Sequence, residues 1–172
     1  MNQKIMLLLV CSFLWQACCW NGDCPDDDTV VEPNFESAYT PVYMGRSSFE
    51  ESIVLDAPKN IIEAGKIYVF QDLMFVNEVN DGFHVFLNSD PENPQPISFI
   101  NTPGATDVSI KDGIYYINQA VDLIAIEFNA RSSELNVTKR IRNIFPVMIS
   151  PDGFYPIEAT ENNIVVDWIP KN

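Results

Sequence analysis

Hydrophobic positions recur through the body of the chain with a period of about 41 residues, which lies within the range of known structural repeats. When the segment that begins at Ile67 is laid on the segment that begins at Val108, the two match without a gap, and ten apolar positions fall on apolar positions. Three polar positions also agree, because Asn77, Asp81 and Asn88 fall on Asn118, Asp122 and Asn129. The pattern therefore predicts one structural unit that occurs at least twice.

Each unit consists of short runs of β-branched and aromatic residues separated by turn residues, which is typical of β-strands. Asp112 and Gly113 lie between two such runs and predict a two-residue hairpin, because glycine tolerates the positive φ that these turns need. Two prolines between residues 88 and 94 predict a loop, and a last strand follows over residues 97–101. Three alternating residues of the first unit should face a core: Phe83, Val85 and Leu87.

Four strands in about 41 residues are typical of a β-propeller blade. A third copy begins at Asp152, with the shift reduced to 40, and ends in an apolar run over residues 164–168. We therefore expect an all-β domain over residues 38–172, with two complete propeller-like blade repeats and one partial repeat. Known propellers close with about four to eight blades, so three outcomes stay open. The sheets pack as an open sandwich, a partner completes them, or the chain is a truncated form of a longer propeller.

A strand upstream of the first unit is expected to complete the last one. Residues 53–55 form a short apolar run after a segment in which Ser48 and Glu51 have the spacing of a capping box, which predicts a short helix. We expect residues 53–55 to supply the missing fourth strand of the third repeat.

The third strand of the second unit reads Leu-Ile-Ala-Ile-Glu over residues 123–127, and residues 164–167 read Ile-Val-Val-Asp. Both resemble the repeat that gives the LVIVD-repeat proteins their name. The stretch from Phe75 to Pro94 is similar to the first repeat of a group of envelope lipoproteins in that family. The resemblance covers roughly residues 40–168 and implies a propeller-like body on a lipid anchor, with no assigned activity. The relatives are much longer, and this chain resembles their N-terminal portion.

Residues 1–18 have the anatomy of an export signal. Lys4 provides the positive start, and about eleven mostly apolar residues follow before a short polar break. A membrane-spanning helix needs roughly 20 apolar residues, so this run should target the chain rather than span a membrane. Ala17 and Cys18 resemble the end of a bacterial lipobox, which implies a lipoprotein signal peptide over residues 1–18 and lipidation of Cys18. Cys19 is the alternative acceptor, and a plain signal peptide with incidental cysteines is the other interpretation.

Residues 19–37 are acidic and contain few apolar residues, so we expect a tether between the anchor and the domain. The acidic run over residues 26–28 resembles the signal that exports some Gram-negative lipoproteins to the cell surface; the alternative is a solvated linker. Thr29 lies in a sequence that resembles the O-glycosylation sequon of the same bacterial group, which makes it a candidate O-glycosylation site. All four cysteines precede residue 25, so the domain cannot be a disulfide scaffold.

The formal net charge of −14 argues against nucleic acid as a partner, because binding a phosphate backbone begins with lysine and arginine. We find no motif of a hydrolase elbow, phosphate loop or zinc protease, and His84 is the single histidine. We expect His84 to be a surface or inter-blade residue. Asn88, Asp90, Glu92 and Asn93 gather oxygen atoms, but their counterpart in the second unit loses the acid, so we expect an ordinary turn. No catalytic, cofactor or metal site is predicted.

These observations together predict a cell-envelope lipoprotein, held on the outer membrane by its acyl anchor and exposed at the surface. We expect a binding or scaffold module rather than an enzyme. Its partners would be the lipid bilayer and, through exposed edge strands, a second copy, another envelope protein or a glycan. The alternative from another class is a carbohydrate-active enzyme that uses a pair of carboxylates, as glycosidases do.

Overall fold

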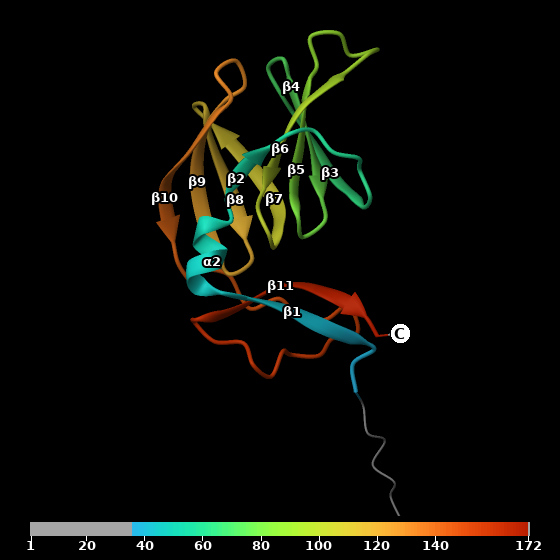
Figure 1. Ribbon diagram of the computed structural model, residues 1–172, viewed down its shortest axis with the longest axis vertical. Coiled ribbons are helices and arrows are strands. Elements are labelled where there is room, and N and C mark those ends of the chain that lie inside the picture. The colour runs from blue at the N-terminus through green and yellow to red at the C-terminus, as the bar shows by residue number, and fades with distance from the viewer. Residues whose placement is uncertain (1–35, 172) are drawn as a thin grey trace, which may run out of the picture. The chain divides into compact units, whose positions relative to one another are not determined.

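The computed structural model describes residues 36–171 and has an all-β fold, with 54% of residues in strands and 4% in helix (Figure 1). The strands form antiparallel sheets, and none of the sheets closes on itself within these residues. The five-stranded sheet has the order β2-β6-β5-β4-β3, with β2 Val54–Asp56, β3 Ala64–Phe70, β4 Leu73–Glu78, β5 Gly82–Leu87 and β6 Gln95–Asn101. The four-stranded sheet has the order β10-β9-β8-β7, with β7 Ala105–Lys111, β8 Ile114–Gln119, β9 Asp122–Asn129 and β10 Glu134–Ile141. A two-stranded sheet pairs β1 Tyr39–Gly45 with β11 Asn163–Pro170, and the helix α2 Arg46–Glu51 follows β1.

The bounds of β7 and β8 are those of β3 and β4 moved forward by the repeat period that the sequence shows. The pairing of the first two strands also shifts register at the same place in both sheets, between Ala64 and Ile67 and between Ala105 and Asp107. In the second sheet Asn118 fills this irregularity, because its Oδ1 accepts hydrogen bonds from the amides of residues 106 and 107. The agreement of Asn77 and Asn118 in the sequence therefore reflects a shared place beside a strand irregularity.

The five-stranded and four-stranded sheets share one apolar core. The ring centroid of Phe75 lies 5.2 Å from that of Tyr115 and 6.4 Å from that of Phe128, so side chains of the two sheets interlock. The buried members of this core are Ile53, Phe75, Phe83, Val85, Ile100, Ala105, Val108, Tyr115, Ile117, Ile124 and Ile126. Phe83 and Val85 confirm the predicted core face, whereas Leu87 remains 42% exposed.

The gapless alignment of the two units is wrong in their third strand. Glu78 pairs with Gly82, but Gln119 pairs with Asp122, so the turn before β9 is one residue shorter than the turn before β5. A slip of one residue moves every side chain of a strand to the other face of its sheet. Ile124 consequently lies on the side of Ile117 and not at the counterpart of Phe83.

The strand that completes the last unit is not the one that the sequence suggested. Residues 54–56 form β2, which pairs with β6 of the first unit, with Leu55 opposite Ile100. The partner of β11 is β1, in which Met44 lies opposite Ile164. Packing explains the choice, because Leu55 adds to the core between the two larger sheets, whereas Met44 packs on a separate apolar cluster that contains Ile164.

The third unit provides one strand rather than three. In the stretch between β10 and β11, Gly153 has a φ of +90° and donates to the Ser150 carbonyl, while Ser150 donates to the Phe154 carbonyl. Residues 152–153, which match Asp112 and Gly113 in the repeat, thus form a turn, but no strand flanks it. Pro146, Pro151 and Pro156 interrupt this stretch, and proline cannot donate to a strand ladder.

The predicted capping box at Ser48 and Glu51 is wrong, because the N-cap of α2 is Gly45, three residues before Ser48, and no side chain caps the helix. Phe49 is fully buried and anchors this short helix to the cluster around β11. Within residues 36–171 no helix is long and apolar enough to cross a lipid bilayer.

Removing the Phe75 ring should destabilise the domain strongly, because the ring fills the centre of the core between the sheets. We expect Phe75→Ala to lower the free energy of unfolding by about 3–5 kcal/mol. The matched control is Tyr155→Ala, because Tyr155 is 77% exposed and its loss should cost less than about 0.5 kcal/mol. Urea unfolding measures both, and similar losses in the two variants would contradict the shared core.

Candidate functional site

Three predicted site residues lie outside the described part of the chain. These are the lipidation candidates Cys18 and Cys19 and the glycosylation candidate Thr29. His84 and the loop over residues 88–93 lie inside it. In that loop the Asp90 carboxylate accepts a hydrogen bond from the amide of Glu92, and the Asp90 carbonyl accepts one from the amide of Asn93. Among the described residues no three acidic, histidine or cysteine side chains gather closely enough to hold a metal ion.

His84 is buried and paired, which differs from the predicted surface or inter-blade position. Its Nε2 lies 2.7 Å from Glu78 Oε2, and its ring packs edge-on against Phe99. The Glu78 carboxylate also accepts hydrogen bonds from the amides of Ile62 and Glu63. This pair thereby fixes the segment that leads into β3 to the outer side of the five-stranded sheet.

Charge on Glu78 is stabilised by these donors. Burial alone would raise the pKa of the Glu78 carboxyl, but hydrogen bonds from the Glu63 amide, His84 and the Ile62 amide outweigh burial, and the pKa is lowered. Glu78 and His84 are 4% and 2% exposed, so a substrate does not reach them. We assign the pair to the fold rather than to catalysis.

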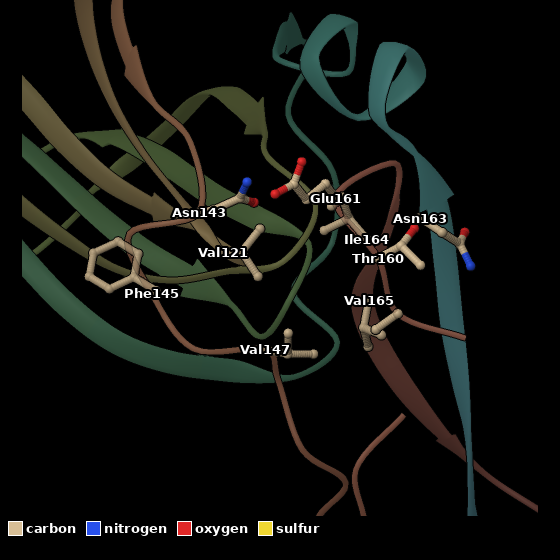
Figure 2. Close-up of a pocket in the computed structure, with 10 residues that line it drawn as sticks. Val121, Asn143, Phe145, Val147, Thr160, Glu161, Asn163, Ile164 and Val165 are labelled. Carbon is tan, nitrogen blue, oxygen red and sulfur yellow. The ribbon is translucent and has the colours of Figure 1, made fainter. Parts of the chain in front are cut away.

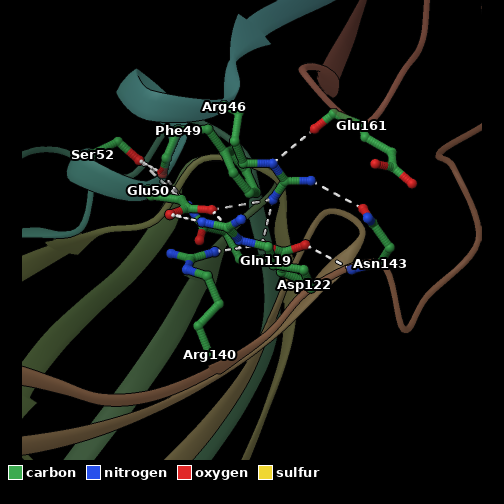
Figure 3. Close-up of polar contacts among 10 residues, drawn as sticks. Arg46, Phe49, Glu50, Ser52, Gln119, Asp122, Arg140, Asn143 and Glu161 are labelled. Carbon is green, nitrogen blue, oxygen red and sulfur yellow. Dashed lines mark hydrogen bonds and ion pairs between the residues drawn. The ribbon is translucent and has the colours of Figure 1, made fainter.

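A second polar cluster surrounds Asp122, which is fully buried at the start of β9 (Figure 3). Its Oδ2 accepts hydrogen bonds from Arg46 at 2.6 Å and from Arg140 at 2.7 Å. Its Oδ1 accepts a bond from the amide of Asn143 at 3.0 Å. One carboxylate therefore joins α2, β10 and the start of the segment that leads to β11.

Arg46 extends this junction to the other side. Its Nε donates to the carbonyl of Glu161, and its Nη2 donates to Asn143 Oδ1 at 3.0 Å. Gln119 also holds the helix, because its amide nitrogen donates to the Phe49 carbonyl. The sequence repeat pointed to Asp122 through its match with Asp81, but it gave no sign of the arginine partners, which are distant along the chain.

A pocket of about 260 Å³ lies beside this junction (Figure 2). Val121, Phe145 and Val147 provide apolar walls, and Asn143 and Glu161 belong to both the pocket and the arginine cluster. Glu161 is the one titratable side chain among the ten lining residues, so this pocket lacks the carboxylate pair that glycoside hydrolysis needs. Its lining suits an apolar group that also accepts or donates a few hydrogen bonds.

The outer face of the four-stranded sheet is a further open apolar surface. Ile114, Tyr116, Leu123, Ala125 and Ile141 line a shallow pocket of about 270 Å³ together with Thr138 and Lys139. Sequence reasoning missed this surface, because the gapless alignment assumed that the second and third strands pair in the same register in both units. The signal that would have found it is the turn before β9, which is one residue shorter than its counterpart.

A scan against protein-family models finds no match, and searches of curated proteins and of solved structures find none either. The function proposed below is inferred from the residues of this chain.

Neutralising Asp122 should be costly, because it leaves two arginines without their shared anion. We expect Asp122→Asn to lower the free energy of unfolding by about 3–5 kcal/mol. The matched control is Asp81→Asn, which changes the sequence counterpart of Asp122. Asp81 pairs with Lys59 on the surface, where such pairs contribute about 1 kcal/mol or less. Urea unfolding at neutral pH distinguishes the two, and an equal effect would refute the buried junction.

The Glu78 carboxyl should make stability depend on pH. Its pKa is lower in the folded chain than in the unfolded chain, so its contribution is full above the unfolded value of about 4.3 and is lost as the pH falls through the folded value. Unfolding measured from pH 6 to pH 3 should show a shallower loss of stability for Glu78→Gln than for the wild type. Asp107 and Asp152, whose pKa values are also lowered, provide the remaining slope. An unchanged slope would contradict this role.

Proposed function

We propose that this chain is a cell-envelope lipoprotein whose β domain, residues 38–172, acts as a binding or scaffold module on the outer membrane surface. The signal-like N-terminus and the cysteine that follows Ala17 support the lipid anchor. The acidic stretch over residues 19–37 would place the domain at a distance from the bilayer. Lipidation falls on Cys18 in this proposal, with Cys19 as the alternative.

We further propose that the two larger sheets are propeller-like blades, as in the LVIVD-repeat proteins. Strand bounds that recur with the period of the sequence repeat, and two sheets packed face on face, support this assignment. The strands β1 and β11 would be the remains of a third blade.

A binding role is supported best by one observation, which is the exposed apolar surface on both larger sheets. Ile67 and Val69 are 62% and 63% exposed on β3, and Tyr116 and Ile141 are 38% and 45% exposed on the four-stranded sheet. Contiguous apolar patches on soluble domains mark interaction sites. His84 and the buried carboxylates of Glu78 and Asp122, by contrast, make contacts that hold the fold together.

The strong acidity of the chain narrows the partner class. A charge of −14 opposes the approach of nucleic acid and of anionic lipid headgroups, so we place the domain above the membrane rather than against it. Partners that suit this surface are apolar faces of envelope proteins, including other copies of the chain.

Lipid attachment is testable by metabolic labelling of the full chain with an alkyne analogue of palmitate. We expect the wild type to be labelled and to sediment with membranes, and Cys18→Ala to lose both properties. Cys19→Ala is the matched control and should keep both. If Cys19→Ala loses the label and Cys18→Ala keeps it, the acceptor is Cys19. A wild type that carries no label would contradict the lipoprotein assignment.

A further inference from the structure

The inner face of one sheet corresponds to the outer face of the other. Leu73 and Phe75 of β4 face the shared core, but their counterparts in the second unit, Ile114 and Tyr116, line the outer pocket of the four-stranded sheet. Antiparallel pairing confirms the sides, because Phe75 lies opposite Val85 whereas Tyr116 lies opposite Ala125. The outer face of the four-stranded sheet thus presents the residue types with which the five-stranded sheet makes its core.

The outer face of the five-stranded sheet corresponds in turn to the inner face of the four-stranded sheet. Its exposed members Ile67 and Val69 correspond to Val108 and Ile110, which pack in the shared core from the side of the four-stranded sheet. Met74, opposite Val69, likewise corresponds to the buried Tyr115.

The segment that leads into β3 covers part of this outer face, since Lys59 lies over the Phe99 ring and the amides of Ile62 and Glu63 bind Glu78. The uncovered part on β3 and β4 and the outer face of the four-stranded sheet are therefore the two unmated halves of an interface that the chain already forms once within itself.

Charged side chains of both signs occur on the two outer faces. By strand register, Lys111 and Lys139 lie on the side of Ile114 and Ala125 in the four-stranded sheet, accompanied there by Glu127. On the outer side of the five-stranded sheet Asp56 lies opposite Phe99, and Lys59 lies over the Phe99 ring. The correspondence of the apolar positions, rather than charge, therefore identifies a second copy of the chain as the partner.

We propose that copies of this chain associate head to tail, with the outer face of the four-stranded sheet of one copy seated on the outer face of the five-stranded sheet of the next. This proposal deepens the proposed binding role by naming the partner, and it rests on that role. The contact repeats the geometry of the internal interface, in which Phe75 packs against Tyr115. Tyr116 of one copy would lie against Val69 and Met74 of the next. Because such a contact is heterologous, it builds a ring of sheets if the rotation closes and a filament if it does not.

Photo-crosslinking in the full chain tests the contact and its polarity. Tyr116 is replaced by p-benzoylphenylalanine in one copy, which is co-expressed with a second copy that carries a larger tag. We expect a crosslinked product with the mass of the two copies together, and we expect mass spectrometry to place the crosslink on β3 or β4 of the tagged copy.

Substitutions in the tagged copy distinguish contact between unlike faces of the two copies from contact between the same face of both copies. Val69→Glu in the tagged copy should lower the crosslinked product about tenfold or more, because it places a carboxylate in the apolar contact. Tyr116→Glu in the tagged copy should leave the product unchanged, since that copy receives the probe with its other face. Ile157→Glu is the control for an exposed apolar residue outside both faces, at 98% exposure, and should have no effect. Thermal unfolding verifies that each variant folds.

Three results would overturn the proposal. The first is no crosslink between the two copies, and the second is a crosslink to a different protein instead. The third is a crosslink between copies that Tyr116→Glu in the tagged copy abolishes while Val69→Glu does not. Failure of the lipoprotein assignment is recognised separately, because palmitate labelling does not depend on contact between the sheets.

Discussion

The apolar face shared by the two larger sheets is the interaction on which the rest of the structure depends. Phe75 packs there against Tyr115 and Phe128, and this contact sets which side of the strands in the two larger sheets faces the shared core. Side chains alternate along a strand, so a sheet whose strands are apolar on both sides needs a partner on both sides. One contact between two sheets satisfies half of that need. The exposed Val69 and Tyr116 are the direct consequence.

The connection between the two-stranded sheet and the larger sheets has a different physical basis. Phe49, Ile164 and Val166 form a small apolar cluster, and the Asp122 carboxylate beside it collects hydrogen bonds from Arg46 and Arg140. Asp81, which the gapless alignment matches with Asp122, is partly exposed and pairs with Lys59. The shorter turn before β9 places Asp122 opposite Gln119, where the first unit has Gly82 opposite Glu78, so the two aspartates lie at different places in their sheets.

Anchoring and self-association would reinforce one another in the proposed lipoprotein. A lipid anchor confines copies to a surface, where their effective concentration is far higher than in solution, so contacts that are weak individually become sufficient. In the proposed assembly, the strong negative charge of the chain would keep the remaining surfaces apart.

The sequence alone determined the all-β class, the recurrence of the first two strands with a period of about 41 residues and the turn at Asp112 and Gly113, because alternation and turn chemistry are local properties. It also located Asp122 as a repeated polar position. Only the tertiary structure decided which face of β9 is buried, because that depends on one residue of turn length. It likewise decided that β1, not β2, pairs with β11, and that Arg46 reaches Asp122 across 76 residues of chain. Contacts between distant segments are selected by how whole surfaces pack, and a local pattern does not encode that competition.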